Sequence, residues 1–141
     1  MTPEQKTLVK TTWDLVVPIS DTAAQLFYGK LFELDPSTRP MFRSTDMPEQ
    51  RKKLMQALAT VIAGLDNLAP LIPVLQNLGK KHVAYGVLDT HYDSVGAALL
   101  WTLEQGLQKA WTPPVKDAWV AAYTTVAGVM RDAAKGVSAA A

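Results

Sequence analysis

Three prolines that each follow a residue able to cap a helix divide this chain into segments. They stand in the pairs Thr2-Pro3, Asp35-Pro36 and Thr112-Pro113. A threonine or aspartate side chain accepts a hydrogen bond from the unpaired N–H groups of a helix's first turn. Proline suits the first helical position, because its missing N–H would have no partner there. Each pair therefore predicts the start of a helix.

Apolar residues recur at helical spacing in the first half of the chain. Leu8, Trp13 and Val16 indicate a first helix after the Thr2-Pro3 pair. A second helix begins near residues 20–21, and a short helix ends near residues 41–42. Pro48 is predicted to open a longer helix. The inner face of this longer helix contains Gln50, Leu54, Leu58, Val61 and Leu65.

The second half of the chain predicts three more helices. Residues 67–73 interrupt the pattern, and a helix that carries Leu75, Leu78 and His82 follows them. Gly86 ends this helix, because glycine tolerates the left-handed conformation found at helix ends. The last two helices are long. Their apolar faces contain Val95, Leu99, Leu103 and Leu107 in one, and Trp119, Tyr123, Val126 and Met130 in the other.

The predicted fold class is all-α, because no segment alternates apolar and polar residues as a strand does. The 141 residues, of which 48% are hydrophobic, suit one domain over residues 1–141 with a single core. Helices of unequal length, with a short one in the middle, do not favour a regular four-helix bundle. They favour a fold built around another chemical group.

The composition excludes several classes of function. A chain without cysteine forms no disulfide, zinc–cysteine site, iron–sulfur cluster or catalytic thiol. Its net charge of +1, from 14 basic and 13 acidic residues, gives no strong attraction to nucleic acid or to an anionic membrane. The N-terminus lacks the pattern of a signal peptide, and no apolar run reaches the roughly 18 residues of a membrane span. We therefore expect a cytoplasmic protein with small ligands as partners.

His82 is the residue that points most directly to a chemistry, because the chain has only two histidines. Imidazole is a good axial ligand for heme iron, and a histidine on a short apolar helix can hold such a group in a helical protein. A histidine next to Lys80 and Lys81 is, taken alone, more often a packed or solvated residue than a ligand. Residues elsewhere in the chain must decide between these interpretations.

Several separated motifs give the chain a resemblance to a known family. They are Phe27-Tyr28, Asp35-Pro36, Met41-Phe42, residues 50–56, residues 78–87, and Ala118-Trp119 with Tyr123. In this order they resemble the globins, and most of all the neuroglobin-like and bacterial single-domain members related to the flavohemoglobin globin domain. The resemblance implies a globin fold, which is a three-over-three helical sandwich around heme b (iron protoporphyrin IX).

The resemblance also assigns roles around the cofactor. It implies that His82 is the proximal iron ligand through Nε2, while its Nδ1–H donates to a backbone carbonyl, for which that of Leu78 is expected. Phe42 would stack on the porphyrin, although an aromatic residue at a helix end is more often plain core. Lys53 is a candidate partner for a heme propionate, with Arg43 as a second. The residues expected to contact the cofactor are Phe42, Lys53, Leu54, Leu58, Leu78, His82, Val87, Tyr92 and Val95.

Tyr28 and Gln50 match the two positions where the family places polar distal residues. The resemblance implies that they donate hydrogen bonds to bound O₂, on which negative charge develops. Alternatively, the Tyr28 hydroxyl is satisfied elsewhere and Gln50 faces solvent. Neuroglobins carry a second iron-binding histidine at the position of Gln50. Glutamine is a poor iron ligand and His91 should not reach this side, so we expect a distal site open to gas or water.

Tyr92 stands ten residues after His82, as the proximal tyrosine does in globins that resemble the flavohemoglobin domain. In those proteins a glutamate on the last helix works with the tyrosine to raise electron donation to iron. The matching position in this chain is Ala134, and Asp132 lies on a different side of the helix. The resemblance therefore gives weaker support to dedicated peroxidase or dioxygenase chemistry.

Three functions follow from these residues. The first is reversible binding of O₂, and of CO and NO, in transport, storage or sensing, without enzymatic activity. The second is a nitric oxide dioxygenase that works with a separate reductase, since such chemistry belongs largely to the cofactor. The third is a helical interaction module without heme, which would make the positions of His82, Tyr28 and Gln50 coincidental.

Overall fold

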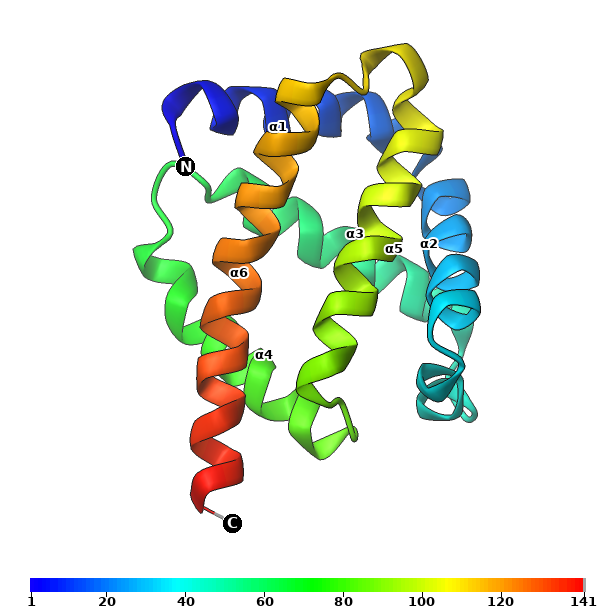
Figure 1. Ribbon diagram of the computed structural model, residues 1–141, viewed down its shortest axis with the longest axis vertical. Coiled ribbons are helices and arrows are strands. Elements are labelled where there is room, and N and C mark those ends of the chain that lie inside the picture. The colour runs from blue at the N-terminus through cyan, green and yellow to red at the C-terminus, as the bar shows by residue number, and fades with distance from the viewer. Residues whose placement is uncertain (141) are drawn as a thin grey trace.

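The computed structural model describes residues 1–140, which contain helices and no strand, as the all-α prediction requires (Figure 1). The α-helices are α1 (Pro3–Val16), α2 (Ser20–Leu34), α3 (Met47–Ala63), α4 (Ile72–Ala84), α5 (Asp89–Leu107) and α6 (Pro113–Ala140). Short 3₁₀ helices lie between them: η1 (Val17–Ile19), η2 (Pro36–Phe42), η3 (Ala69–Leu71) and η4 (Gln108–Ala110). The short helix predicted over residues 36–42 is η2.

All three predicted caps form. Thr2 accepts from the backbone N–H of Gln5 at 3.1 Å, and the Gln5 side chain accepts in return from the backbone N–H of Thr2 at 3.0 Å. Asp35 accepts from the backbone N–H of Ser37 at 3.2 Å. Thr112 accepts from the backbone N–H of Val115 at 3.4 Å. The capped prolines therefore set the starts of α1, η2 and α6.

Both predicted ends of α3 were wrong by one or two residues. The helix begins at Met47, because Asp46 caps it by accepting from the backbone N–H of Glu49 at 3.3 Å. Pro48 takes the second helical position, where its missing N–H is equally harmless. The helix ends at Ala63, so Leu65 is buried beyond the helix and not on its inner face.

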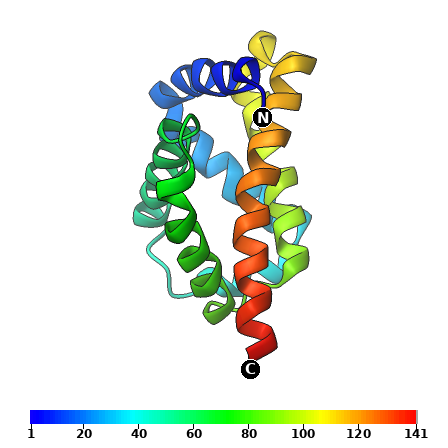
Figure 2. The same cartoon turned by 90° about the vertical axis from the view of Figure 1, so that its left-hand side faces the viewer.

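The six α-helices form two layers, with α1, α3 and α4 over α2, α5 and α6. Figure 2 shows α3 and α4 on one side of the molecule and α5 and α6 on the other, with α1 across the top. Consecutive helices α3 and α4 pack on other elements more than on each other: α3 lies mainly against α2, and α4 mainly against α6. None of the described helices combines the length and the apolar character that crossing a membrane requires.

Two clusters of buried apolar side chains stabilise these layers. The larger cluster includes Trp13, Phe27 and Trp119, and the Trp119 indole N–H is satisfied by the Thr12 hydroxyl at 2.9 Å. The smaller cluster consists of Leu75, Tyr92, Ala127 and Met130, and it joins α4 and α5 to α6. Most of the predicted site residues belong to these two clusters or pack against them.

Gly79 sets the distance between α4 and α6, three residues before His82. A Cβ atom at this position would lie 2.4 Å from the backbone oxygen of Met130 and 2.9 Å from its Cα. Backbone atoms cannot move aside as a flexible side chain does. Only glycine therefore permits this approach, and the approach places the helix that carries His82.

Gly79→Ala is expected to destabilise the fold by about 1–3 kcal/mol, because the two helices must separate to admit the methyl group. Gly128→Ala on α6 is the matched control, since a Cβ there meets nothing within 4 Å. This control should stabilise the protein by about 0.5–1 kcal/mol through its better helix propensity. Urea unfolding measures both. Equal stability of Gly79→Ala and the parent would contradict the close approach.

Candidate functional site

His82 lies in the last turn of α4 and uses only one of its ring nitrogens within the fold. Its Nδ1 lies 2.6 Å from the backbone oxygen of Leu78, and Nε2 has no hydrogen-bond partner among the described residues. Since a carbonyl oxygen only accepts, Nδ1 carries a proton, and in the neutral ring this tautomer leaves the lone pair on Nε2. This is the geometry of a histidine oriented to bind a metal through Nε2.

The chain leaves α4 through a glycine turn that uses the carbonyl of His82 itself. Gly86 has a φ of +87°, which only glycine adopts readily. The backbone N–H of Val87 donates to the oxygen of His82 at 2.9 Å, and that of Gly86 donates to Val83 at 3.0 Å. This pair of bonds is a Schellman motif, as expected for a helix that ends before a glycine. The loop after α4 is therefore bonded directly to the backbone of His82.

Tyr28 on α2 and Gln50 on α3 lie side by side. The Gln50 side-chain amide donates to the Tyr28 hydroxyl oxygen at 3.2 Å. Tyr28 is buried, and this burial raises the pKa of its phenol, while the bond from Gln50 acts in the opposite direction. The phenol therefore stays protonated at neutral pH. Because its oxygen is the acceptor from Gln50, its own hydrogen remains available to another partner.

Aromatic rings surround Tyr28 and separate it from water. The ring of Phe42 lies edge-on to that of Tyr28 at a centroid distance of 5.4 Å, and Phe27 lies edge-on at 5.0 Å. Phe32 contacts both Tyr28 and Phe42, at 6.1 and 5.6 Å. Phe42, at the end of η2, thus belongs to the same group of residues as the Tyr28–Gln50 pair. A hydrogen bond made here is strengthened by the low local dielectric.

The apolar residues predicted for the site divide between the two clusters. Phe42, Leu54, Leu58 and Val95 are half-buried and pack against the larger cluster, whereas Leu78 and Val87 are half-buried against the smaller one. Tyr92 is a buried member of the smaller cluster. Lys53 is exposed on α3, and no contact among the described residues tests its role.

Tyr92 has a buried hydroxyl with no hydrogen-bond partner among the described residues. Its ring faces the Arg131 guanidinium at 5.1 Å, and its backbone oxygen accepts from the Tyr123 hydroxyl at 2.6 Å. Burial raises the pKa of the Tyr92 phenol, and Arg131 opposes this shift. Ala134 lines the same hollow as Tyr92 and Arg131. The space beside Tyr92 is therefore lined by the charged side chain of Arg131 on α6. Ala134 supplies no carboxylate there.

The contacts of Arg131 between α6 and α5 were not predicted from the sequence. Its guanidinium donates to Asp93 at 2.8 Å and to the backbone oxygen of Asp89 at 3.2 Å, and its Nε lies 3.4 Å from the Asp89 carboxylate. These bonds fasten α6 to the first turns of α5. The partners lie 38 and 42 residues away, so no local spacing in the sequence could have revealed them.

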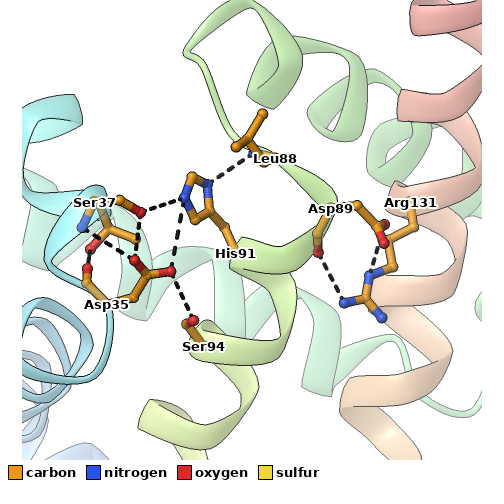
Figure 3. Close-up of polar contacts among 8 residues, drawn as sticks. Asp35, Ser37, Leu88, Asp89, His91, Ser94 and Arg131 are labelled. Atoms are coloured by element: carbon orange, nitrogen blue, oxygen red, sulfur yellow. Dashed lines mark hydrogen bonds and ion pairs between the residues drawn. The ribbon is translucent and has the colours of Figure 1, made fainter.

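His91 is the second feature that the sequence did not reveal, and Figure 3 shows its polar neighbours. Its Nδ1 accepts from the backbone N–H of Leu88 at 2.9 Å, and its Nε2 lies 3.0 Å from the Ser37 hydroxyl. Ser37 in turn bonds to the Asp35 carboxylate, which also accepts from Ser94 at 3.0 Å. Both nitrogens of His91 are thus engaged, as expected for a histidine that does not take part in the distal site.

Three observations fit a heme between α3 and α4. These consecutive helices pack on other elements more than on each other. His82 presents a free Nε2, which is the atom that heme iron requires from a proximal histidine. The apolar residues that would line the group are only half-buried by protein atoms. The donor set thus suits heme, with Gln50 unable to act as a second strong iron ligand.

Known proteins of similar sequence and structure identify the family to which the chain belongs. The family model described as Globin matches residues 25–130. A flavohemoprotein of Vibrio cholerae is 32% identical over 94% of this chain, which spans about a third (34%) of that relative. Neuroglobin-1 of Oncorhynchus mykiss is 29% identical, over 92% of this chain and 90% of its own.

A solved structure gives the same result for the fold. The bacterial globin of Campylobacter jejuni superposes with a TM-score of 0.85 and 27% identity, over 96% of this chain and 98% of its own. The predicted globin fold is therefore confirmed. By the match of its sequence to the family model and by this three-dimensional similarity, the chain belongs to the globin family.

Proposed function

We propose that this protein reversibly binds O₂, and other diatomic gases such as CO and NO, at the iron of heme b. His82 would hold the iron through Nε2, and Tyr28 and Gln50 would donate hydrogen bonds to the bound gas. The observation that carries the proposal is the bond from Gln50 to the buried Tyr28 hydroxyl, which leaves the phenol hydrogen for a ligand. Residues 1–141 act as one globin domain in this proposal.

On the proximal side, the proposed role of the chain is to hold one imidazole in a fixed orientation. Heme, when bound, supplies an iron atom with an open position for a gas. The bond from His82 to the Leu78 carbonyl fixes the tautomer and makes Nε2 a better electron donor. Leu78 and Val87 flank His82 in sequence, and Tyr92 follows on α5. We assign all three to the proximal wall of the cofactor site.

On the distal side, Tyr28 and Gln50 act as one unit. Gln50 donates to the Tyr28 oxygen and so polarises the phenol, which makes its hydrogen a stronger donor. This donor would stabilise O₂, which develops partial negative charge on binding, more than it would stabilise CO, which develops less charge. Leu54 and Leu58 provide apolar walls that exclude water, and Phe42 holds the porphyrin. Lys53 remains a proposed partner for a propionate.

A second candidate function is nitric oxide dioxygenase activity. It is favoured by the similarity to flavohemoproteins, of which the Vibrio cholerae protein is an example. Each turnover would combine one NO, one O₂ and one electron into nitrate, so a separate reductase is the proposed partner. The alanine at position 134 and the cation of Arg131 beside Tyr92 favour the carrier over this enzyme. The expected cytoplasmic location stays a prediction.

The two functions are separated by NO turnover measured with a generic flavin reductase and NADH as the electron supply. Both functions predict that NO consumption stops after about one equivalent per heme when re-reduction is withheld, because each turnover uses one electron. The carrier function predicts that turnover stays slow when the reductase is present. Turnover that is fast and rises in proportion to added reductase would instead favour the dioxygenase. A flavohemoprotein assayed in parallel is the positive control.

A further inference from the structure

We propose that His91 is a positioning residue for the proximal histidine. It fixes the loop between α4 and α5, and the loop fixes the direction in which His82 presents its Nε2. The inference rests on the proposed role of His82 in the function above. It concerns a residue outside the set assigned to contact the cofactor or the gas. It is carried by the polar cluster of His91, Leu88, Ser37, Asp35 and Ser94 (Figure 3).

His91 and Leu88 are joined by two reciprocal hydrogen bonds at the start of α5. The backbone N–H of Leu88 donates to His91 Nδ1 at 2.9 Å, and the backbone N–H of His91 donates to the Leu88 oxygen at 3.0 Å. The first bond has the role that a glutamate or glutamine plays three residues into many helices, where it reaches back to the N-cap N–H. Leu88 is therefore held to α5 at two points.

The other side of the His91 ring is held by a second segment. Since Nδ1 accepts from Leu88, the ring proton lies on Nε2 and donates to the Ser37 hydroxyl at 3.0 Å. Ser37 then donates to Asp35, whose side chain also caps η2. The imidazole is only 5% exposed, so water does not compete with these bonds. This arrangement is not a catalytic triad, because Asp35 lies on the Nε2 side with Ser37 and does not orient Nδ1.

The loop transmits this restraint to His82 over a short distance. Leu88 lies six residues after His82, and Val87 bonds directly to the His82 carbonyl at 2.9 Å. Gly86 is fixed in its turn by the bond to Val83. A displacement of Leu88 therefore pulls on the last turn of α4, in which the His82 ring is oriented. At its far end the cluster reaches η2, which carries Phe42, so His91 links both sides of the proposed cofactor site.

The experiment compares three variants of the full chain. His91→Leu removes both side-chain bonds. His91→Gln keeps an acceptor for the Leu88 N–H, because glutamine is a natural residue at this helical position. Ser94→Ala is the matched control, since it removes a bond to Asp35 from α5 without touching the loop.

The first readout is amide hydrogen exchange of the heme-free protein, which needs no cofactor. His91→Leu is expected to raise the exchange rate of the Val87 and Leu88 amides about tenfold, the effect of one lost hydrogen bond. His91→Gln and Ser94→Ala should stay close to the parent. Unchanged protection of Val87 in His91→Leu would overturn the proposed restraint on the loop.

The second readout is the iron–histidine stretching band in the Raman spectrum of the ferrous, heme-loaded protein. We expect the band to shift and broaden in His91→Leu and to return to the parent position in His91→Gln. A parent-like band in His91→Leu, with His82 still bound to iron, would overturn the positioning role alone. Absence of the band from the parent would overturn the assignment of His82 itself, so the two failures are distinguishable.

Discussion

His82→Ala is expected to abolish stable heme binding. The substitution removes the only side chain proposed to bond the iron. The bond between His82 Nδ1 and the Leu78 carbonyl orients the ring and leaves Nε2 without a partner among the described residues. Loss of an outer hydrogen bond to a metal ligand typically costs 10–100-fold in affinity, so loss of the ligand itself should cost more than about 100-fold. Heme transfer to apomyoglobin measures the effect.

Two further variants make this result specific. Lys81→Ala is the matched control, because Lys81 is exposed beside His82 and has no assigned role. It should retain heme as the parent does. His82→Gly leaves space for free imidazole, which should restore heme binding and the parent-like spectrum. Heme retention by His82→Ala equal to that of the parent would refute the proximal assignment.

Tyr28→Phe is expected to accelerate O₂ dissociation far more than CO dissociation. The ring and its packing on Phe42 remain, and only the hydroxyl is lost. A hydrogen bond to a charged partner contributes about 1.5–3 kcal/mol, which corresponds to roughly 10–100-fold in the dissociation rate of O₂. CO develops little charge and should change by only a few-fold. Stopped-flow measurements on both gases give the ratio.

Tyr123→Phe is the control for this prediction, because it removes another phenol hydroxyl, one that bonds to the Tyr92 backbone oxygen, from a residue with no assigned role at the site. It should leave the ratio of O₂ to CO dissociation rates unchanged. Gln50→Leu combined with Tyr28→Phe forms a double-mutant cycle, and we expect strong coupling since Gln50 polarises the phenol. Equal acceleration of both gases by Tyr28→Phe would contradict a distal hydrogen bond.

Much of the fold was predictable because its signals are local. A capping side chain, a proline and a 3.6-residue apolar period all act within a few residues, and they located the starts of α1, η2 and α6. Gly86 was a reliable end of α4 for the same reason, since its left-handed backbone closes a Schellman turn. Asp46 was overlooked as a cap. Asp46 comes directly before Met47-Pro48, and the apolar period alone does not distinguish a helix start at Met47 from a start at Pro48.

The candidate site was less predictable, because its geometry depends on contacts between distant residues. The orientation of His82 was predictable, since Leu78 is one helical turn away. Tyr28 and Gln50 were paired only through resemblance, and they lie 22 residues apart. Nothing in the sequence indicated that His91 joins Ser37, 54 residues away, or that Arg131 covers the ring of Tyr92. Such pairs arise from the packing of helices, which no single segment encodes.

A heme held by His82 with an open distal position would be visible in the absorption spectrum of the heme-reconstituted protein. Spectra are recorded for the ferric form, for the ferrous form, and for the ferrous form in air. We expect a strong Soret band, a five-coordinate ferrous spectrum, and a stable, reversible change on addition of O₂. A protein that takes up no heme, or a ferrous spectrum with two strong axial ligands, would contradict this expectation.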